Sequence, residues 1–278
     1  MHRKTNGKSI LSICLYHRFH IFGVFLLALL LLLASRHGLL RSQRTMAISP
    51  ESPPGFATRS ATRGDLEAIT TIAILGWVFD KQWDYRFPYA KQYPEDHRHW
   101  TKARYSQYMD EVEAGKAMMM VAEKRPDSSS TESNIVAFSI WQLPGHHIKP
   151  ATPGKPTPTG PSTQDPERKD ANLARMKLFR EVLNKGKAQY FDNIYGESQL
   201  YLMTLVTHPD HFRRGAGTTL MRWGLEKAKQ EKLVITLFAS QMGYGLYKKL
   251  GFGVVGEVTV QIEGEEEKLN IPGMTIMP

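Results

Sequence analysis

The sequence predicts one α/β domain from Phe56 to the C-terminus, preceded by a basic leader. Strand-like apolar segments alternate with segments of helical periodicity along that part of the chain. The charge is placed unevenly: seven of the 36 Lys and Arg residues lie in residues 1–50, which hold no acid, so 29 remain against 27 acidic residues. The net charge of +9 therefore belongs mostly to the leader, and the domain is not expected to bind nucleic acid. The one cysteine, Cys14, excludes a disulfide framework and a thiolate-built zinc site.

The leader, residues 1–45, contains the apolar run Ile21–Ala34. Fourteen helical residues span about 21 Å, less than the ~30 Å hydrocarbon core, and extension to Leu40 gives about twenty. We predict an N-terminal apolar helix over residues 21–40 that acts as a single-pass signal anchor. A cleaved signal peptide and a translation start at Met46 are the alternatives. The protein is expected in a membrane if the leader is retained, and in the cytoplasm if translation starts at Met46.

The first half of the domain follows a Pro-rich joint over residues 46–55. A helix should open at Arg63-Gly64-Asp65, because its apolar residues then recur on one face. An aromatic-rich stretch, residues 77–93, lies between this helix and the next. The predicted elements are a strand over 56–62, helices to about 79 and over 97–113, and an antiparallel strand pair over 117–123 and 135–143.

The second half begins with a Pro-rich insertion, residues 144–170, in which proline excludes regular structure. A helix over 171–185 follows. The remaining elements read as a βαβαβ unit, with strands over 199–207, 233–239 and 253–262 and helices over 217–232 and 242–250. Residues 274–277 are a candidate for one further strand.

A glycine-rich turn, Arg213-Arg214-Gly215-Ala216-Gly217, joins the predicted strand 199–207 to a helix. Glycines at such a junction allow the backbone to approach a ligand closely. The first helical turn also leaves N–H donors unpaired, and its dipole favours an anion. This pattern suits a pyrophosphate, although a tight turn with two solvated arginines is equally compatible with it.

A second motif follows the strand after this helix, Leu246-Tyr247-Lys248-Lys249-Leu250-Gly251-Phe252. Together, the two motifs and the strand between them resemble the GCN5-related N-acetyltransferase (GNAT) family, most of all its small fungal enzymes. The resemblance covers about residues 200–260, and a weaker one reaches back to Phe56. It implies a GNAT fold: a mixed, mostly antiparallel central sheet with flanking helices, in which the strands over 199–207 and 233–239 splay apart.

The resemblance also implies an acetyl-CoA site and no metal. The Leu205 N–H would polarise the acetyl carbonyl, and Tyr247 would protonate the departing thiolate. Two positions depart from the family pattern: Phe212 stands where glutamine or arginine is usual, and Ser240 where asparagine is usual. The implied coenzyme-binding residues are Leu205, Val206, Thr207, Phe212, Arg213, Arg214, Gly215, Ala216, Gly217, Thr218, Ser240 and Tyr247.

The general base and the acceptor pocket are less clearly marked. Glu197 is the first candidate base, by position alone. The other candidates are Asp192, Tyr201, His97, His99, His146, His147 and His208. As in the family, the acceptor should bind between the first two helices, where an aromatic pocket suits an amine through apolar and cation–π contact. Its candidate residues are Trp83, Tyr85, Phe87 and Tyr89, with Asp84 as a candidate partner for a cationic acceptor. Packing of a lid is the alternative interpretation of these aromatic residues.

The expected function is transfer of an acetyl group from acetyl-CoA to an amine of a small molecule or peptide. The amine would attack the thioester directly, and the enzyme would gain much of its rate from proximity and orientation. The alternative is an inactive acyl-CoA-binding module, possibly tethered to a membrane. A third interpretation makes the protein a membrane scaffold in which the leader carries the function.

Overall fold

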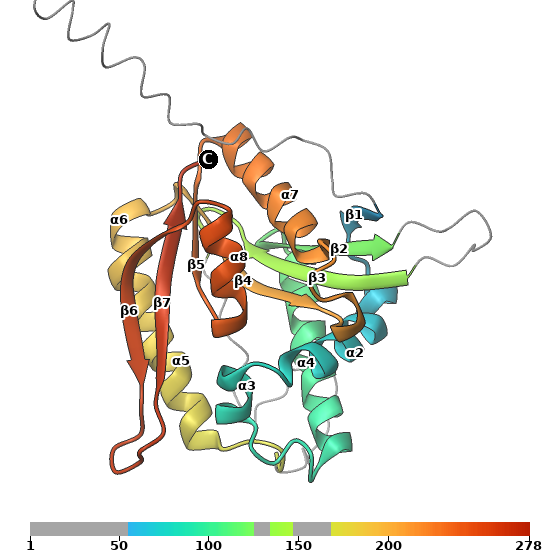
Figure 1. The fold of residues 1–278 in the computed structure, drawn as a ribbon, viewed down its shortest axis with the longest axis vertical. Helices are drawn as coiled ribbons and strands as arrows, with labels where there is room; N and C mark the ends of the chain where they lie inside the picture. The colour runs from blue at the N-terminus through green and yellow to red at the C-terminus, as the bar shows by residue number, and fades with distance from the viewer. Residues whose placement is uncertain (1–54, 125–133, 147–167) are drawn as a thin grey trace, which may run out of the picture. The chain divides into compact units, whose positions relative to one another are not determined.

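A computed structural model of the chain describes residues 55–124, 134–146 and 168–278. Its strands form one sheet in the order β1-β2-β3-β4-β5-β7-β6 (Figure 1). The strands are β1 (Phe56–Ser60), β2 (Ala117–Lys124), β3 (Asn134–Gln142), β4 (Gln199–Thr207), β5 (Val234–Phe238), β6 (Gly253–Val260) and β7 (Leu269–Ile276). Neighbours are antiparallel except for β4 and β5, which run parallel. The prediction of a mixed, mostly antiparallel sheet is confirmed.

Helices begin where the sequence supplies capping groups. Asp80, Asn172 and Ser240 each accept a backbone N–H in the first turn of the helix that follows. The helices are α2 (Leu66–Trp77), α3 (Lys81–Arg86), α4 (Pro94–Glu113), α5 (Leu173–Lys187), α6 (Asn193–Tyr195), α7 (Ala216–Glu231) and α8 (Gln241–Lys249). Short turns lie at Arg63–Asp65, Ala188–Asp192 and Pro209–His211. The sequence did not predict α3, because a helix of six residues shows too little periodicity.

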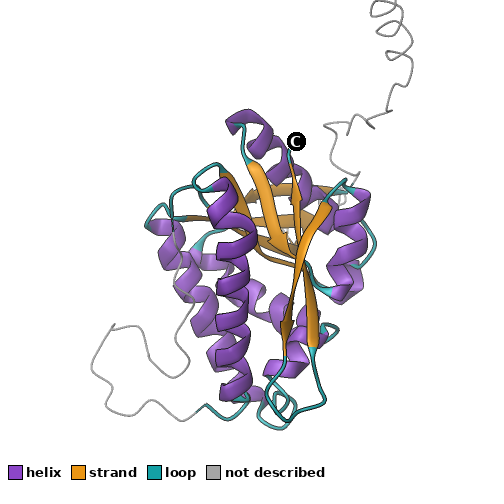
Figure 2. Cartoon of the chain, turned by 90° about the vertical axis from the view of Figure 1, so that its left-hand side faces the viewer, coloured by secondary structure: helices purple, strands orange, loops and turns teal. Residues whose placement is uncertain are grey.

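The sheet separates two apolar cores, and alternation along β2 shows how. Met119 and Val121 point to the core shared with α2 and α4, while Met120 and Ala122 point to the core shared with α7. Figure 2 shows the sheet with helices on both of its sides. Trp141 on β3 packs so close to α7 that a Cβ at Gly224 would lie 2.2 Å from its ring.

The C-terminal end of the sheet differs from the prediction. The last strand begins at Leu269, not at Met274, and β7 inserts between β5 and β6. The predicted βαβαβ order of elements is confirmed, but its third strand, β6, does not pair with β5, because β7 lies between them. The cause is a hairpin: β6 and β7 are antiparallel neighbours, and the turn between them contains Gly264 at φ +84°. Helix α5 packs against β6 and β7 through Phe179.

The parallel pair β4 and β5 separates partway along its length. Residues 199–202 pair with 234–237, after which β5 ends and the second half of β4 has no strand on that side. Met203 forms a bulge in the register between β4 and β3. A bulge bends its strand, so this one helps to turn the end of β4 away from β5. The predicted splayed pair is present, and it opens a wedge in the sheet.

Helix α2 and the end of β4 are in unusually close contact. A Cβ on Gly76 would lie 2.6 Å from Val206 Cγ1 and 2.7 Å from the backbone oxygen of Thr207. Only glycine allows the two backbones to approach so closely. This contact fixes the C-terminal end of α2 beside the open half of β4.

The predicted leader helix, nearly all of the Pro-rich joint and residues 147–167 of the insertion lie outside the described residues. Within the described ranges, the search for a helix of membrane-spanning length and hydropathy finds none.

Candidate active site

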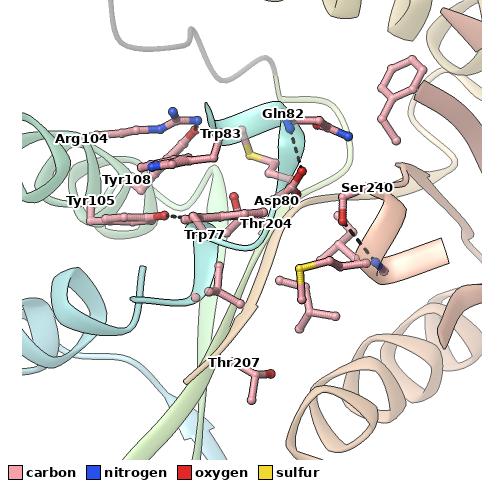
Figure 3. Close-up of a pocket in the computed structure, with 18 of the residues that line it drawn as sticks. Trp77, Asp80, Gln82, Trp83, Arg104, Tyr105, Tyr108, Thr204, Thr207 and Ser240 are labelled. Carbon is pink, nitrogen blue, oxygen red and sulfur yellow. Dashed lines mark hydrogen bonds between the residues drawn. The ribbon is translucent and has the colours of Figure 1, made fainter. Parts of the chain in front are cut away.

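One cleft of about 1510 Å³ occupies the wedge beside β4 (Figure 3). The open half of β4, the end of β5 and the N-termini of α7 and α8 line one end of it. Helices α3, α4 and α5 and the C-terminal end of α2 line the rest. A cleft of this volume is large enough for two ligands, each contacting a different set of elements.

The first end of the cleft contains the N-terminus of α7. Gly215 precedes this helix at φ +100°, and Arg213 also has a positive φ, of 59°. No side chain caps the helix, so the first-turn N–H groups of residues 216–218 have neither an intrahelical nor a side-chain acceptor. Such a turn forms a cradle for an anion. Free backbone donors thus lie at the position where the sequence predicts a pyrophosphate site.

The residues predicted to bind the coenzyme come together in this cleft. A Cβ on Gly217 would lie 3.5 Å from Thr207 Oγ1 and 3.9 Å from Leu205 Cδ2, which places the α7 N-terminus against the open half of β4. Of the twelve, Arg214 alone is not among the residues that line the cleft; it is exposed. The eleven that line it are Leu205, Val206, Thr207, Phe212, Arg213, Gly215, Ala216, Gly217, Thr218, Ser240 and Tyr247.

The two departures from the family pattern have structural roles. Phe212 packs edge-to-face on Phe79, with ring centroids 5.6 Å apart, and so joins the glycine turn to the segment after α2. Ser240 caps α8, where its hydroxyl oxygen accepts the N–H of Gly243 at 3.1 Å (Figure 3). Neither residue blocks the cradle, because the N–H donors belong to the backbone of α7.

Tyr247 lies on α8 at the boundary between the two ends. Its side chain is 6% exposed, and its ring contacts that of Phe252. Burial, reinforced by the charge of Asp80, raises the pKa of Tyr247 well above its ordinary 10.0. The phenol therefore keeps its proton at neutral pH and is a proton donor in this site.

Asp80 is a buried carboxylate that the sequence analysis missed. It is 2% exposed and caps α3, with Oδ1 accepting the N–H of Gln82 at 2.8 Å. Oδ2 has no hydrogen-bond partner among the residues that the structure describes. Burial raises the pKa of Asp80 above its ordinary 3.8, although the Gln82 N–H, the charge of Arg86 and the hydroxyl of Ser240 favour the ionised form. Asp80 thus presents an unpartnered oxygen to the middle of the cleft (Figure 3).

Aromatic side chains form the wall of the second end. Trp77 and Trp83 stack with ring centroids 5.7 Å apart, and the Trp77 indole N–H donates to the Tyr105 hydroxyl at 3.1 Å (Figure 3). Of the four predicted acceptor residues, Trp83 and Phe87 line the cleft. Tyr85 is instead buried among α5 and β6–β7, because α3 turns its side chain away from the cleft. Tyr89, three residues beyond the end of α3, is exposed outside the cleft.

Behind Trp83 lies a buried polar chain. The Trp83 indole N–H donates to Nε2 of His97 at 3.3 Å, so Nδ1 of His97 carries the proton and donates to Asp170 at 2.5 Å. Burial opposes ionisation of Asp170, but hydrogen bonds from His97 and Arg168 outweigh it and lower the pKa of the carboxyl. His97 is therefore a support for Trp83 and does not face the reacting groups.

Glu197, the first candidate base, is exposed beside Gly145 and does not line the cleft. Asp192 accepts from Lys187 and Gln199 instead. Tyr201 lines the cleft, but burial raises its pKa, so it stays protonated at neutral pH.

The remaining candidate positions are mostly outside the cleft. His208 accepts the N–H of Asp210 at a turn, as a cap. His146 and Asp84 are exposed, His99 is exposed at the edge of the cleft, and His147 lies outside the described residues. No group of three or more potential metal ligands occurs among the residues that the structure describes.

Comparison with known proteins finds acetyltransferases. A curated protein named "Acetyltransferase", from Stachybotrys chartarum, is 28% identical over 219 residues, which is 78% of this chain and 89% of that protein. Residues 183–252, which hold the glycine turn and Tyr247, match the acetyltransferase (GNAT) family. These matches support a GNAT family member and an acyltransferase of the N-acetyltransferase type.

Solved structures similar to this GNAT chain include two acetyltransferases. One is described as histone acetyltransferase HPA2 and related acetyltransferase, from Corynebacterium glutamicum (17% identity, 81% of this chain and 98% of that one, TM-score 0.49). The other is the PaiA N-acetyltransferase from Thermoplasma acidophilum, in complex with coenzyme A (14% identity, 80% and 99%, TM-score 0.43).

Sequence reasoning did not select several residues that line the cleft. Among them are Asp80, Trp77, Tyr105, Arg86 and Arg104. A signal existed for Asp80: it follows the apolar face of a helix and precedes a short charged segment, as an N-cap does. The positions of the other four depend on how α3 and α4 pack, which no local pattern encodes.

Proposed function

We propose that this GNAT enzyme transfers the acetyl group of acetyl-CoA directly to an amine of a small molecule or peptide. The observation that carries the proposal is the position of two buried groups of opposite function in one cleft. Tyr247 has a raised pKa and holds a proton, and Asp80 has a free oxygen that can accept one. They lie between the anion cradle of α7 and the aromatic wall of α3 and α4, where a thioester and an amine would meet.

In this proposal Asp80 replaces Glu197 as the base. Oδ2 of Asp80 receives a proton from the acceptor ammonium, and the neutral amine attacks the carbonyl carbon. A C–N bond forms and the C–S bond breaks, while Tyr247 gives its proton to the sulfur and coenzyme A leaves as the thiol. The nitrogen loses its second proton to water as the neutral amide forms. The backbone N–H of Leu205 stabilises the charge on the carbonyl oxygen. Exchange with water then returns a proton to Tyr247 and removes one from Asp80.

The test uses the purified full chain. Calorimetric titration with acetyl-CoA measures binding, and release of the coenzyme thiol over pools of amines measures transfer. Asp80→Asn retains the cap of α3, because asparagine is also an N-cap residue, and should lower turnover about 10²- to 10⁴-fold with acetyl-CoA affinity unchanged. Asp84→Asn is the matched control, since Asp84 is the exposed acid of the same helix.

Equal turnover in Asp80→Asn and the unchanged enzyme would remove Asp80 from the mechanism. Acetyl-CoA binding without thiol release from any amine would instead favour an inactive acyl-CoA-binding module. Tyr247→Phe also distinguishes an active transferase from an inactive acyl-CoA-binding module. In a transferase, this variant should lose turnover while its affinity for acetyl-CoA stays unchanged.

A further inference from the structure

Two arginines of the aromatic end of the cleft have no carboxylate partner in the described part of the chain. Arg86, on α3, is 8% exposed and uses Nε to donate to the backbone oxygen of Gln82 at 2.8 Å. Arg104, on α4, donates to the Tyr108 hydroxyl at 3.2 Å (Figure 3). Among the described residues, no carboxylate lies within ion-pair distance of either guanidinium, and both side chains line the cleft.

Two other cations of the cleft form ion pairs. Arg168 forms an ion pair with Asp170, and Lys187 forms one with Asp192. Asp80 does not serve Arg86 in this way, although its charge favours the ionised guanidinium. Burying a charge is costly unless it is paired, so the absence of a partner at two adjacent positions calls for an explanation.

Aromatic rings hold the Arg86 guanidinium in place without neutralising it. Its Cζ lies 4.2 Å from the ring centroid of Phe179 and 5.3 Å from those of Trp83 and Phe87. Burial, followed by the charge of Arg104, lowers the pKa of Arg86 to about 9, so the group is still charged at neutral pH. Arg86 and Arg104 both line the same cleft, next to Trp83, Phe87, Tyr105 and Tyr108 of its aromatic wall.

We propose that the amine acceptor also carries a carboxylate, which Arg86 and Arg104 bind at the aromatic end of the cleft. The inference rests on the proposed function, because it treats this end as the acceptor pocket. A guanidinium offers a planar pair of donors that matches the two oxygens of a carboxylate. Asp80 then faces the amine, the arginines face the carboxylate, and the stacked Trp77 and Trp83 face an apolar skeleton between them.

The binding test needs no acetyl transfer. 3-Phenylpropanoate and its neutral isostere 3-phenylpropanamide are titrated into the full chain, and binding is followed by calorimetry and by tryptophan fluorescence. We expect the carboxylate to bind at least about tenfold more tightly than the amide. Arg86→Met and Arg104→Met should each remove that preference while leaving coenzyme A affinity unchanged. Arg98→Met is the control, since Arg98 lies on α4 but pairs with Glu67 outside the cleft.

Methionine fills most of the volume of arginine without its charge, so both variants should fold, and a melting curve checks this. Arg104→Lys should keep part of the preference, because it retains the charge without the planar donors. Equal binding of the two probes, no binding of 3-phenylpropanoate, or a preference that survives both methionine variants would overturn the proposal.

A transfer assay separates this inference from the function on which it rests. Phenylalanine and 2-phenylethylamine share an amine and a ring and differ in the carboxylate, so the intact enzyme should favour phenylalanine in kcat/KM. If 3-phenylpropanoate binds more tightly than the amide but neither amine releases the thiol, the proposed transferase activity is refuted and the proposed carboxylate site stands. Faster transfer to 2-phenylethylamine would refute the anion site and retain the transferase.

Discussion

Gly243 lies directly against the ring of Tyr247, one helical turn away on α8. A Cβ at Gly243 would come within 2.7 Å of Cε2 of Tyr247 and 3.2 Å of its phenolic oxygen. The side chain of Tyr247 therefore points back along α8 over a position without a side chain, as long side chains on helices do. The glycine sets where the proposed proton donor lies in the cleft.

Gly243→Ala should displace the Tyr247 ring and lower turnover at least about tenfold, with a smaller effect on acetyl-CoA affinity. Gly245→Ala is the control on the same helix, because a Cβ there meets nothing within 4 Å. That control should keep its activity and gain about 0.5–1 kcal/mol of stability from the better helix former. Steady-state kinetics and thermal melts measure both effects, and equal turnover in the two variants would contradict the role given to Gly243.

The pH profile of transfer should show an acid limb that belongs to Asp80. Burial raises the pKa of this carboxyl above 3.8, and protonation would leave no base for the acceptor. We therefore expect kcat/KM to fall as the pH is lowered through that raised pKa, and the limb to be absent from the residual activity of Asp80→Asn. A profile of the same shape in the variant would assign the limb to another group.

His97 should matter for stability as well as for the position of Trp83. His97→Leu removes the acceptor of the Trp83 N–H and one donor to the buried Asp170, and should cost about 2–4 kcal/mol in the free energy of unfolding. His99→Ala, at an exposed position two residues along, should change it by less than about 0.5 kcal/mol. Urea unfolding measures both, and similar losses in the two variants would show that the buried chain contributes nothing specific.

Asp65 should make the free energy of unfolding of the domain depend on pH in the acidic range. The Arg59 guanidinium, at 2.7 Å, together with the backbone and hydroxyl of Thr62, lowers the pKa of Asp65 to about 2. The pKa is lower in the folded state, so the stabilisation is complete above the unfolded value of about 3.8 and disappears as the pH falls through about 2.

Asp65→Asn should thus be less stable than the unchanged protein by about 1 kcal/mol at pH 7, a figure reduced for the solvent exposure of Arg59. The difference should narrow as the pH falls from 4 towards 2. Denaturant titrations at pH 7, 4 and 3 measure it, and a constant difference across this range would show that the ionisation of Asp65 is not its source.

The sequence predicts well what is local or periodic in this protein. The strand that became β4 and the glycine turn before α7 follow from apolar runs and from glycine chemistry, and the family resemblance supplied the splayed pair. The insertion of β7 between β5 and β6 did not follow, because a hairpin partner is chosen by packing over the whole sheet. The acceptor end was predicted only in part for the same reason: the aromatic run suggested a pocket, but the turn of α3 decides that Trp83 enters it and Tyr85 does not.

The choice of the proposed base was also limited by what a sequence can show. Glu197 was chosen for its place just before β4, yet it is exposed, whereas Asp80 comes from a segment over one hundred residues earlier in the chain. A carboxylate becomes chemically distinctive through burial, and burial is a property of the folded chain.

In the proposed mechanism, the contact at Gly76 aligns the two substrates with each other. It clamps the helix that leads to Asp80 and Trp77 onto the strand that carries Leu205 and Thr207, backbone against backbone. The distance between the incoming nitrogen and the thioester carbon is therefore set by a rigid joint in the scaffold and not by a loop. Substitutions on α3 and α4 could therefore change which acceptor binds. The alignment of the reacting atoms would stay the same, because the contact between α2 and β4 would not change.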